Sequence, residues 1–89
     1  MKVWLIYVVY QYEGCYDTAV YSTKDKACDE ADKLIYKLRD AGYSIVNWCD
    51  SGVFSRDTHE HSQCIVLAND YDEVSISVEM KILDERMLI

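Results

Sequence analysis

The N-terminal part of the chain predicts a β-hairpin. Residues Lys2–Tyr12 are rich in Val, Ile, Tyr and Trp, and their apolar side chains fall on both parities of an extended strand. This pattern is typical of a central strand or of a strand covered on both faces. Glu13-Gly14 then predicts a tight turn, because glycine adopts positive φ without a steric cost. Cys15–Tyr21 is expected to return as the second strand.

The next segment predicts a helix over residues 24–40. Ser22 and Thr23 are N-cap candidates, and Asp25 stands where a carboxylate can accept hydrogen bonds from first-turn amides. Gly42 is suited to end the helix. One apolar stripe at helical spacing is expected to face the core: Ala27, Ala31, Leu34, Ile35 and Leu38. The polar residues between them are expected to face water: Asp29, Glu30, Asp32, Lys33 and Lys37.

Three further strands are expected after the helix. Tyr43–Cys49 and Gln63–Ala68 are short apolar runs, and the polar stretch between them predicts a loop or a ragged hairpin end. From Glu73 to Ile82, apolar and polar residues alternate strictly. This alternation is typical of a strand with one buried and one wet face.

The predicted order of elements is therefore β-β-α-β-β-β. It indicates an α+β fold with a mainly antiparallel sheet of four or five strands and one amphipathic helix packed on one face. The chain has 89 residues, of which 51% are hydrophobic. This length suits one modest core, so a single domain over residues 1–89 is expected.

Charge narrows the class of partner. Sixteen Asp and Glu residues outnumber nine Lys and Arg residues, so the formal net charge is −7. Such a chain repels free nucleic acid and anionic membranes and attracts basic protein surfaces. No apolar run approaches the ~20 residues that span a bilayer. The first residues lack the small-residue cleavage site of a signal peptide, so a cytoplasmic location is expected.

The cysteines do not form a metal or redox motif. Cys15, Cys28, Cys49 and Cys64 stand at intervals of 13, 21 and 15 residues, without a C-x-x-C pair. This spacing fits neither a zinc ribbon nor a thioredoxin-like site. Free buried thiols are expected, and no cofactor is predicted.

The densest group of reactive side chains lies between residues 49 and 64. His59, His61 and Cys64, with Asp57 or Cys49, have the chemistry of a metal site or of a thiol-histidine enzyme site. They also fit a solvated loop. No nucleophile elbow, phosphate loop, Rossmann glycine pattern or H-E-x-x-H motif is present. A non-enzymatic protein is therefore expected, with a small metal- or thiol-dependent enzyme that uses His59, His61 and Cys64 as the alternative.

Acidic residues gather at three places: Asp29-Glu30-Asp32, Asp70-Asp72-Glu73 and Asp84-Glu85. Carboxylates spaced like the phosphates of DNA would imitate a duplex, and that spacing is a property of the folded chain. A solvated surface is the alternative. Asp29, Glu30 and Asp32 are the candidate contacts to a basic partner.

Tyrosines are concentrated in the predicted hairpin. Tyrosine offers a large contact area at low entropic cost and is enriched at interfaces. An exposed patch of Tyr10, Tyr12 and Tyr16 is therefore the second candidate partner site, with cross-strand stacking as the alternative. Met87-Leu88-Ile89 is a candidate self-association contact or a frayed tail.

Three stretches carry a resemblance to a group of known proteins: Lys2–Tyr7, Val20–Ala27 and Glu79–Glu85. A strand, a capped helix after a hairpin, and an acidic final strand resemble small uncharacterised strand-hairpin-helix (ββαβ-type) domains of phages and bacteria. The resemblance covers about half the chain and carries over no catalytic residue. It implies a phage-encoded protein acting in the host cytoplasm.

The expected function is thus a non-enzymatic acidic protein-binding module. The resemblance implies an inhibitor of a host defence, in the manner of an anti-CRISPR protein, or of a nucleic-acid-processing protein. The expected partner is a host protein whose basic surface is occluded, without direct binding to nucleic acid or membrane. A homodimer, and with it a plain structural role, is the third reading of the sequence.

Overall fold

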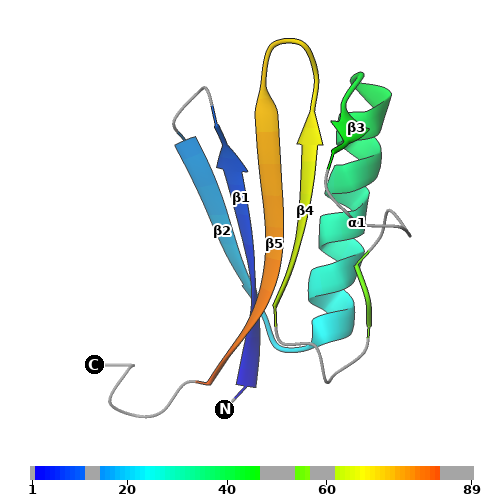
Figure 1. Cartoon of the computed structure of the whole chain (residues 1–89). Helices are drawn as coiled ribbons and strands as arrows, with labels where there is room; N and C mark the ends of the chain where they lie inside the picture. The colour runs from blue at the N-terminus through cyan, green and yellow to red at the C-terminus, as the bar shows by residue number, and fades with distance from the viewer. Residues whose placement is uncertain (1, 12–14, 47–53, 57–61, 83–89) are drawn as a thin grey trace.

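A computed structural model of the chain describes residues 2–11, 15–46, 54–56 and 62–82. These residues form five strands and one helix, which confirms the predicted order and the α+β fold (Figure 1). The elements are β1 (Lys2–Tyr10), β2 (Cys15–Tyr21), α1 (Lys24–Asp40), β3 (Ser44–Ile45), β4 (Ser62–Ala68) and β5 (Glu73–Ile82). The sheet has the order β2-β1-β5-β4-β3 with antiparallel neighbours, so β1 is a central strand, as expected.

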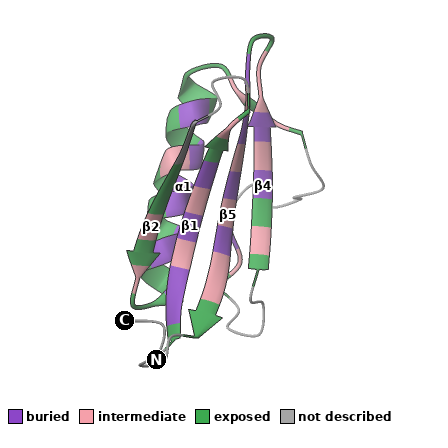
Figure 2. Cartoon of the chain, turned by 90° about the vertical axis from the view of Figure 1, so that its left-hand side faces the viewer, coloured by how far each residue is buried: buried purple, intermediate pink, exposed green. Residues whose placement is uncertain are grey.

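Alternation along the strands gives the sheet one face buried beneath α1 and one more exposed face, on which Val3 is the buried residue of β1. On β1, Trp4, Ile6 and Val8 are buried in the core beneath α1, whereas Val9 is 41% exposed. In Figure 2 the sheet lies in front of α1, and no helix covers the face toward the viewer. One amphipathic helix therefore covers one face, as predicted.

The apolar stripe of α1 packs on the buried face. Ala27, Ala31 and Ile35 are almost fully buried among the inward residues of β1, β4 and β5. Thr23 is the N-cap, and its hydroxyl accepts from the Lys26 N–H at 3.3 Å. Gly42 follows the helix at a φ of 98°, a region that favours glycine. Within the described part of the chain, no helix is both long enough and apolar enough to span a membrane.

Two expectations about the elements need correction. β1 ends at Tyr10, so Gln11 lies beyond the strand that was expected to reach Tyr12, and residues 12–14, with the expected turn at Glu13-Gly14, lie outside the described part. The third strand comprises Ser44–Ile45, shorter at its start than the predicted Tyr43–Cys49, and residues 47–49 lie outside the described part.

Phe54 completes the core from outside the helix and strands. Its side chain is 1% exposed and belongs to the same cluster as Ile35, Ile65 and Ile76. The polar stretch expected to be a loop thus contributes a large buried side chain, and residues 54–56 are held beside α1 and β4.

Candidate functional site

Asp32 holds residues 54–56 against the helix. Its carboxylate accepts from the Phe54 N–H at 3.1 Å and from Arg56 Nη1 at 2.6 Å. The residue is only 9% exposed, which corrects the expectation that Asp32 faces water. The cause is tertiary: Arg56 is 24 residues away in the chain and supplies the charge that a buried carboxylate requires.

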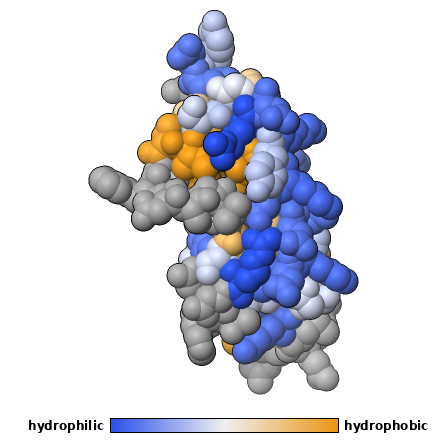
Figure 3. Space-filling view, turned by 90° about the vertical axis from the view of Figure 1, so that its right-hand side faces the viewer, coloured by the Kyte–Doolittle hydropathy of each residue, from blue (hydrophilic) through white to orange (hydrophobic). Residues whose placement is uncertain are grey.

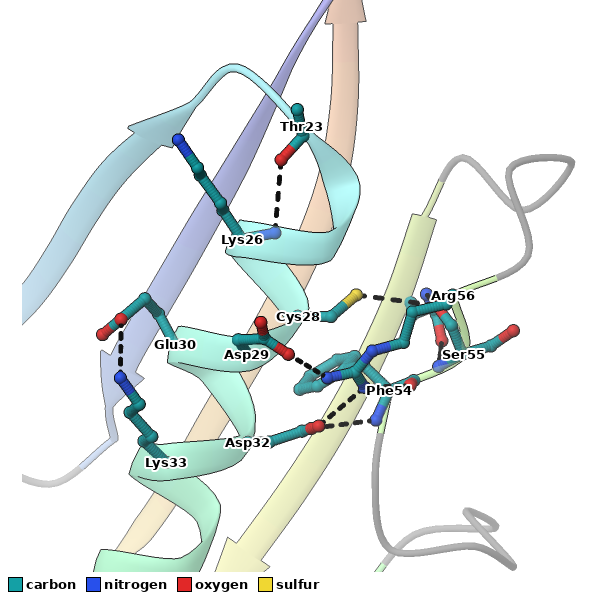
Figure 4. A network of polar contacts seen from close by, with 11 residues as sticks. Thr23, Lys26, Cys28, Asp29, Glu30, Asp32, Lys33, Phe54, Ser55 and Arg56 are labelled. Atoms are coloured by element: carbon teal, nitrogen blue, oxygen red, sulfur yellow. Dashed lines mark hydrogen bonds and ion pairs between the residues drawn. The ribbon is translucent and has the colours of Figure 1, made fainter.

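Arg56 also forms a salt bridge with Asp29, which lies one helical turn before Asp32 (Figure 4). Its Nη2 donates to Asp29 Oδ1 at 2.6 Å, and its Nη1 donates to the Phe54 carbonyl at 2.8 Å. The hydrogen bonds to Asp32 and Asp29 raise the pKa of the Arg56 guanidinium. The guanidinium therefore keeps its charge throughout the pH range in which the protein is folded.

Two further side chains bind the Ser55 backbone. Gln63 Oε1 accepts from the Ser55 N–H at 2.7 Å, and Gln63 Nε2 donates to the Ser55 carbonyl at 2.9 Å. The Cys28 thiol donates to the same carbonyl at 3.5 Å. Burial raises the pKa of Cys28, so this thiol stays protonated near neutral pH.

The predicted acidic site at Asp29, Glu30 and Asp32 is therefore an internally paired cluster. Glu30 pairs with Lys33 at 3.1 Å, and the two aspartates share Arg56. Five acidic and five basic residues alternate along α1, so the helix carries no net charge. The cluster lies on one side of the molecule, but its carboxylates already have cationic partners.

The second acidic cluster lies in the turn between β4 and β5, which forms one tip of the molecule (Figures 1 and 2). Asn69 Oδ1 accepts from the N–H groups of Tyr71 and Asp72 at 2.8 and 2.7 Å. This turn fixes the backbone, so that Tyr71 stands 85% exposed beside the exposed Asp70. Three carboxylates and no cation lie within Asn69–Glu73.

The structure describes the side chain of one of the three tyrosines that were expected to form a patch. Tyr10 is half-buried and packs against the core on the α1 side. The backbone of Tyr16 pairs with Val9, but the side chain of Tyr16 and all of Tyr12 lie outside what the structure describes. Among the described tyrosines, Tyr71 and Tyr36 are the strongly exposed ones, at 85% and 57%.

A groove of about 360 Å³ lies between α1 and the first two strands. Its floor contains Ile6, Val8 and Ala19, and the stems of Lys33 and Lys37 form part of its wall. It exists because one helix is narrower than the sheet it covers. The α1 side of the surface is otherwise mainly hydrophilic, with one hydrophobic area in its upper half (Figure 3).

The reactive residues of the sequence give no assembled centre within the described part of the chain. Cys28 and Cys64 are free thiols, and Cys64 is exposed, which corrects the expectation that it is buried. Over residues 2–11, 15–46, 54–56 and 62–82, no group of His, Cys, Asp and Glu has the geometry of a metal site. The structure does not describe four of the candidate residues, Cys49, Asp57, His59 and His61, nor the side chain of Cys15.

Comparison with known proteins yields no match to a family model, to a curated protein or to a solved structure. The residues above must therefore carry the functional argument themselves. Tyr71 was missed as a site residue, although its position between two aspartates in a predicted turn is a readable signal. Arg56 was missed because its partners are distant in sequence.

Proposed function

We propose that the protein is a non-enzymatic protein-binding module whose β4–β5 turn contacts a basic surface on a partner protein. The observation that carries the proposal is Tyr71, an 85% exposed aromatic side chain on a fixed turn, next to the exposed carboxylate of Asp70. An exposed tyrosine supplies a contact anchor, and the exposed carboxylate beside it favours a cationic partner.

The geometry of the turn suits binding better than catalysis. Its backbone is fixed by Asn69, so little conformational entropy is lost when Tyr71 is captured. Asp70 lies next to it and is exposed, and the net charge of −7 favours encounter with a basic protein at long range. The inhibitor role implied by the phage-domain resemblance is the specific form of this proposal: a basic, nucleic-acid-binding surface on a host protein would be occluded.

The test is capture of proteins from a bacterial lysate on the immobilised full chain and on two variants. Tyr71→Ala with Asp70→Asn alters the turn, and Tyr36→Ala with Asp40→Asn is a matched control that removes one exposed tyrosine and one exposed carboxylate from α1. Bound proteins are identified by mass spectrometry at low and moderate salt.

We expect a partner of basic surface that is retained by wild type and by the control, reduced at least tenfold by the turn variant, and released as salt rises. Equal capture by the turn variant and wild type would overturn the assignment of this site. A captured partner whose binding is unaffected by salt would overturn the electrostatic part of the proposal.

A further inference from the structure

The open face of the sheet carries apolar side chains on β1, β2 and β4, and the outward side chains of β5 between β1 and β4 are polar or charged. The strand register defines three rows of outward residues that cross β1, β5 and β4 in that order. The first row is Val9, Ser75 and Val66, the second is Tyr7, Ser77 and Cys64, and the third is Leu5, Glu79 and Ser62. On β2, Thr18 and Val20 lie on the same face. These residues define the open face. Val9 and Val20 are 41% and 61% exposed, and Cys64 is also exposed. The described residues place neither helix nor strand over them (Figure 2).

This face has the dimensions of a protein interface. Four strands of seven to ten residues offer about 20 Å across and 23–33 Å along, given ~4.8 Å between strands and ~3.3 Å per residue. The projected area is therefore roughly 450–650 Å². Side-chain relief adds to this, so the accessible area approaches the ~800 Å² that each partner contributes to a standard interface.

The charges on β5 are complementary to a reversed copy of themselves. The outward residues run Glu73, Ser75, Ser77, Glu79 and Lys81 along the strand. A two-fold axis that crosses the strands at Ser77 places Glu73 opposite the copy's Lys81, and Lys81 opposite the copy's Glu73. Lys81 lies only 3.7 Å from Glu79 in a half-exposed pair, which leaves it able to bridge a second carboxylate.

The same axis also places apolar residues of one copy opposite apolar residues of the other. It passes along the row of Tyr7, Ser77 and Cys64, so that Val9 of one copy lies over Leu5 of the other. An axis parallel to the strands would instead bring Glu73 near the copy's Glu73 and Lys81 near the copy's Lys81. Like charges in contact disfavour that arrangement.

We infer that the protein forms a two-fold symmetric dimer in which the open faces of two copies stack with β5 antiparallel to the β5 of the other copy. Stacked sheets cross at about 30°, a rotation that long Glu and Lys side chains can follow. The occupant of the face is a second copy of this chain, and the interface is isologous. The inference does not depend on the proposed function of the β4–β5 turn, because Asp70 and Tyr71 lie outside the interface.

The first measurement is sedimentation equilibrium of the full chain over a concentration series, in the presence of a reductant. Val9→Lys places a charge on the open face where Val9 of one copy lies over Leu5 of the other, and Tyr36→Lys places the same charge on the outer surface of α1 as a matched control. Both wild-type side chains are exposed, so neither change removes core packing. We expect a dimer for wild type and Tyr36→Lys, and at least a tenfold higher dissociation constant for Val9→Lys.

The second measurement tests the orientation by charge exchange. Glu73→Lys or Lys81→Glu alone places like charges opposite each other twice per dimer, whereas the double variant restores both pairs with reversed sign. We expect each single change to weaken the dimer about 2- to 30-fold, given ~0.2–1 kcal/mol for each of the two exposed pairs. The double variant should dimerise more tightly than either single variant but less tightly than wild type, because Lys81→Glu also breaks the 3.7 Å ion pair with Glu79.

Three results would overturn the inference. A wild-type chain that is monomeric at about 1 mM has an association weaker than ~4 kcal/mol, which is too weak for a specific dimer. A dimer that Val9→Lys leaves intact uses another surface. A dimer that Val9→Lys dissociates, but whose affinity in the double charge-exchange variant is no higher than in either single variant, has the strands in a different orientation.

Discussion

Substitution of Asp32 tests whether the contact between α1 and residues 54–56 stabilises the fold. The Asp32 side chain is 12% exposed and accepts one hydrogen bond from Arg56 and one from the Phe54 N–H. Asp32→Asn keeps an acceptor for Phe54 but removes the charge, and a charge-assisted bond is roughly twice as strong as a neutral one. The expected loss is about 1–2 kcal/mol of unfolding free energy.

Asp32→Ala should cost more, because it removes both acceptors and leaves the Phe54 N–H without its partner in the core. An unsatisfied buried donor adds about 1–3 kcal/mol, so the total loss is about 2–5 kcal/mol. A domain of this length has a stability of roughly 4–13 kcal/mol, so the loss is a large fraction of it and the unfolding midpoint should be clearly lower. The melting temperature is expected to fall about 4–8 °C for each kcal/mol.

The assay is urea unfolding followed by circular dichroism, with two exposed acidic residues of the same helix as controls. Asp29→Asn breaks a pair whose carboxylate is 62% exposed, and Glu30→Gln breaks one whose carboxylate is 47% exposed. Each should cost less than about 1 kcal/mol. If Asp32→Asn costs no more than Asp29→Asn, or if Asp32→Ala costs no more than Asp32→Asn, the reasoning from burial is wrong.

Four other predictions follow from the described contacts. Phe54→Ala should lower the unfolding free energy by about 3–5 kcal/mol in the same assay, because a fully buried ring is removed from the core. Gly42→Ala should cost about 1–2 kcal/mol through its φ of 98° alone, because no atom lies within 4 Å of the added methyl group; a neutral result would contradict this account. Cys64 should react with a thiol reagent in the native state, whereas Cys28 should react only on unfolding. Burial raises the pKa of Cys28 in the folded protein. As the pH rises above about 8.5, the Cys28 thiol therefore loses its proton in the unfolded chain before it does so in the folded one. The free energy of unfolding should then fall by up to ~1.4 kcal/mol per pH unit, and the Cys28→Ala variant should lack this dependence.

The fold was predictable where its determinants are local. The spacing of Ala27, Ala31 and Ile35 predicted α1 with its observed bounds, and Gly42 marked its end. The alternation in Glu73–Ile82 predicted β5 and its buried side. In each case the apolar residues recur along the sequence with the period of the element, 3.6 residues for a helix or 2 for a strand.

The candidate site was not predictable to the same degree, because it depends on contacts between distant residues. Asp32 reads as one more polar residue on a helix until Arg56 is placed beside it. Phe54 is a single aromatic residue in a polar stretch, without a periodic pattern to mark it as core. Tyr10 packs against the core, and the hairpin register that places it there, in which Tyr10 pairs with Cys15, joins residues of two strands.

The balance of charge on α1 changes what the acidic composition means for binding. A net charge of −7 suggests that every acidic run is a partner site, yet α1 carries equal numbers of acidic and basic residues and uses Asp29 and Asp32 to hold Arg56. Substituting those carboxylates would change stability and binding together, so a loss of binding there would be ambiguous. Asp70 and Tyr71 are exposed at the tip and fill no part of the core, and exposed substitutions usually change stability by less than about 0.5 kcal/mol. Variants of the β4–β5 turn are therefore the ones in which lost binding reports on the interface itself.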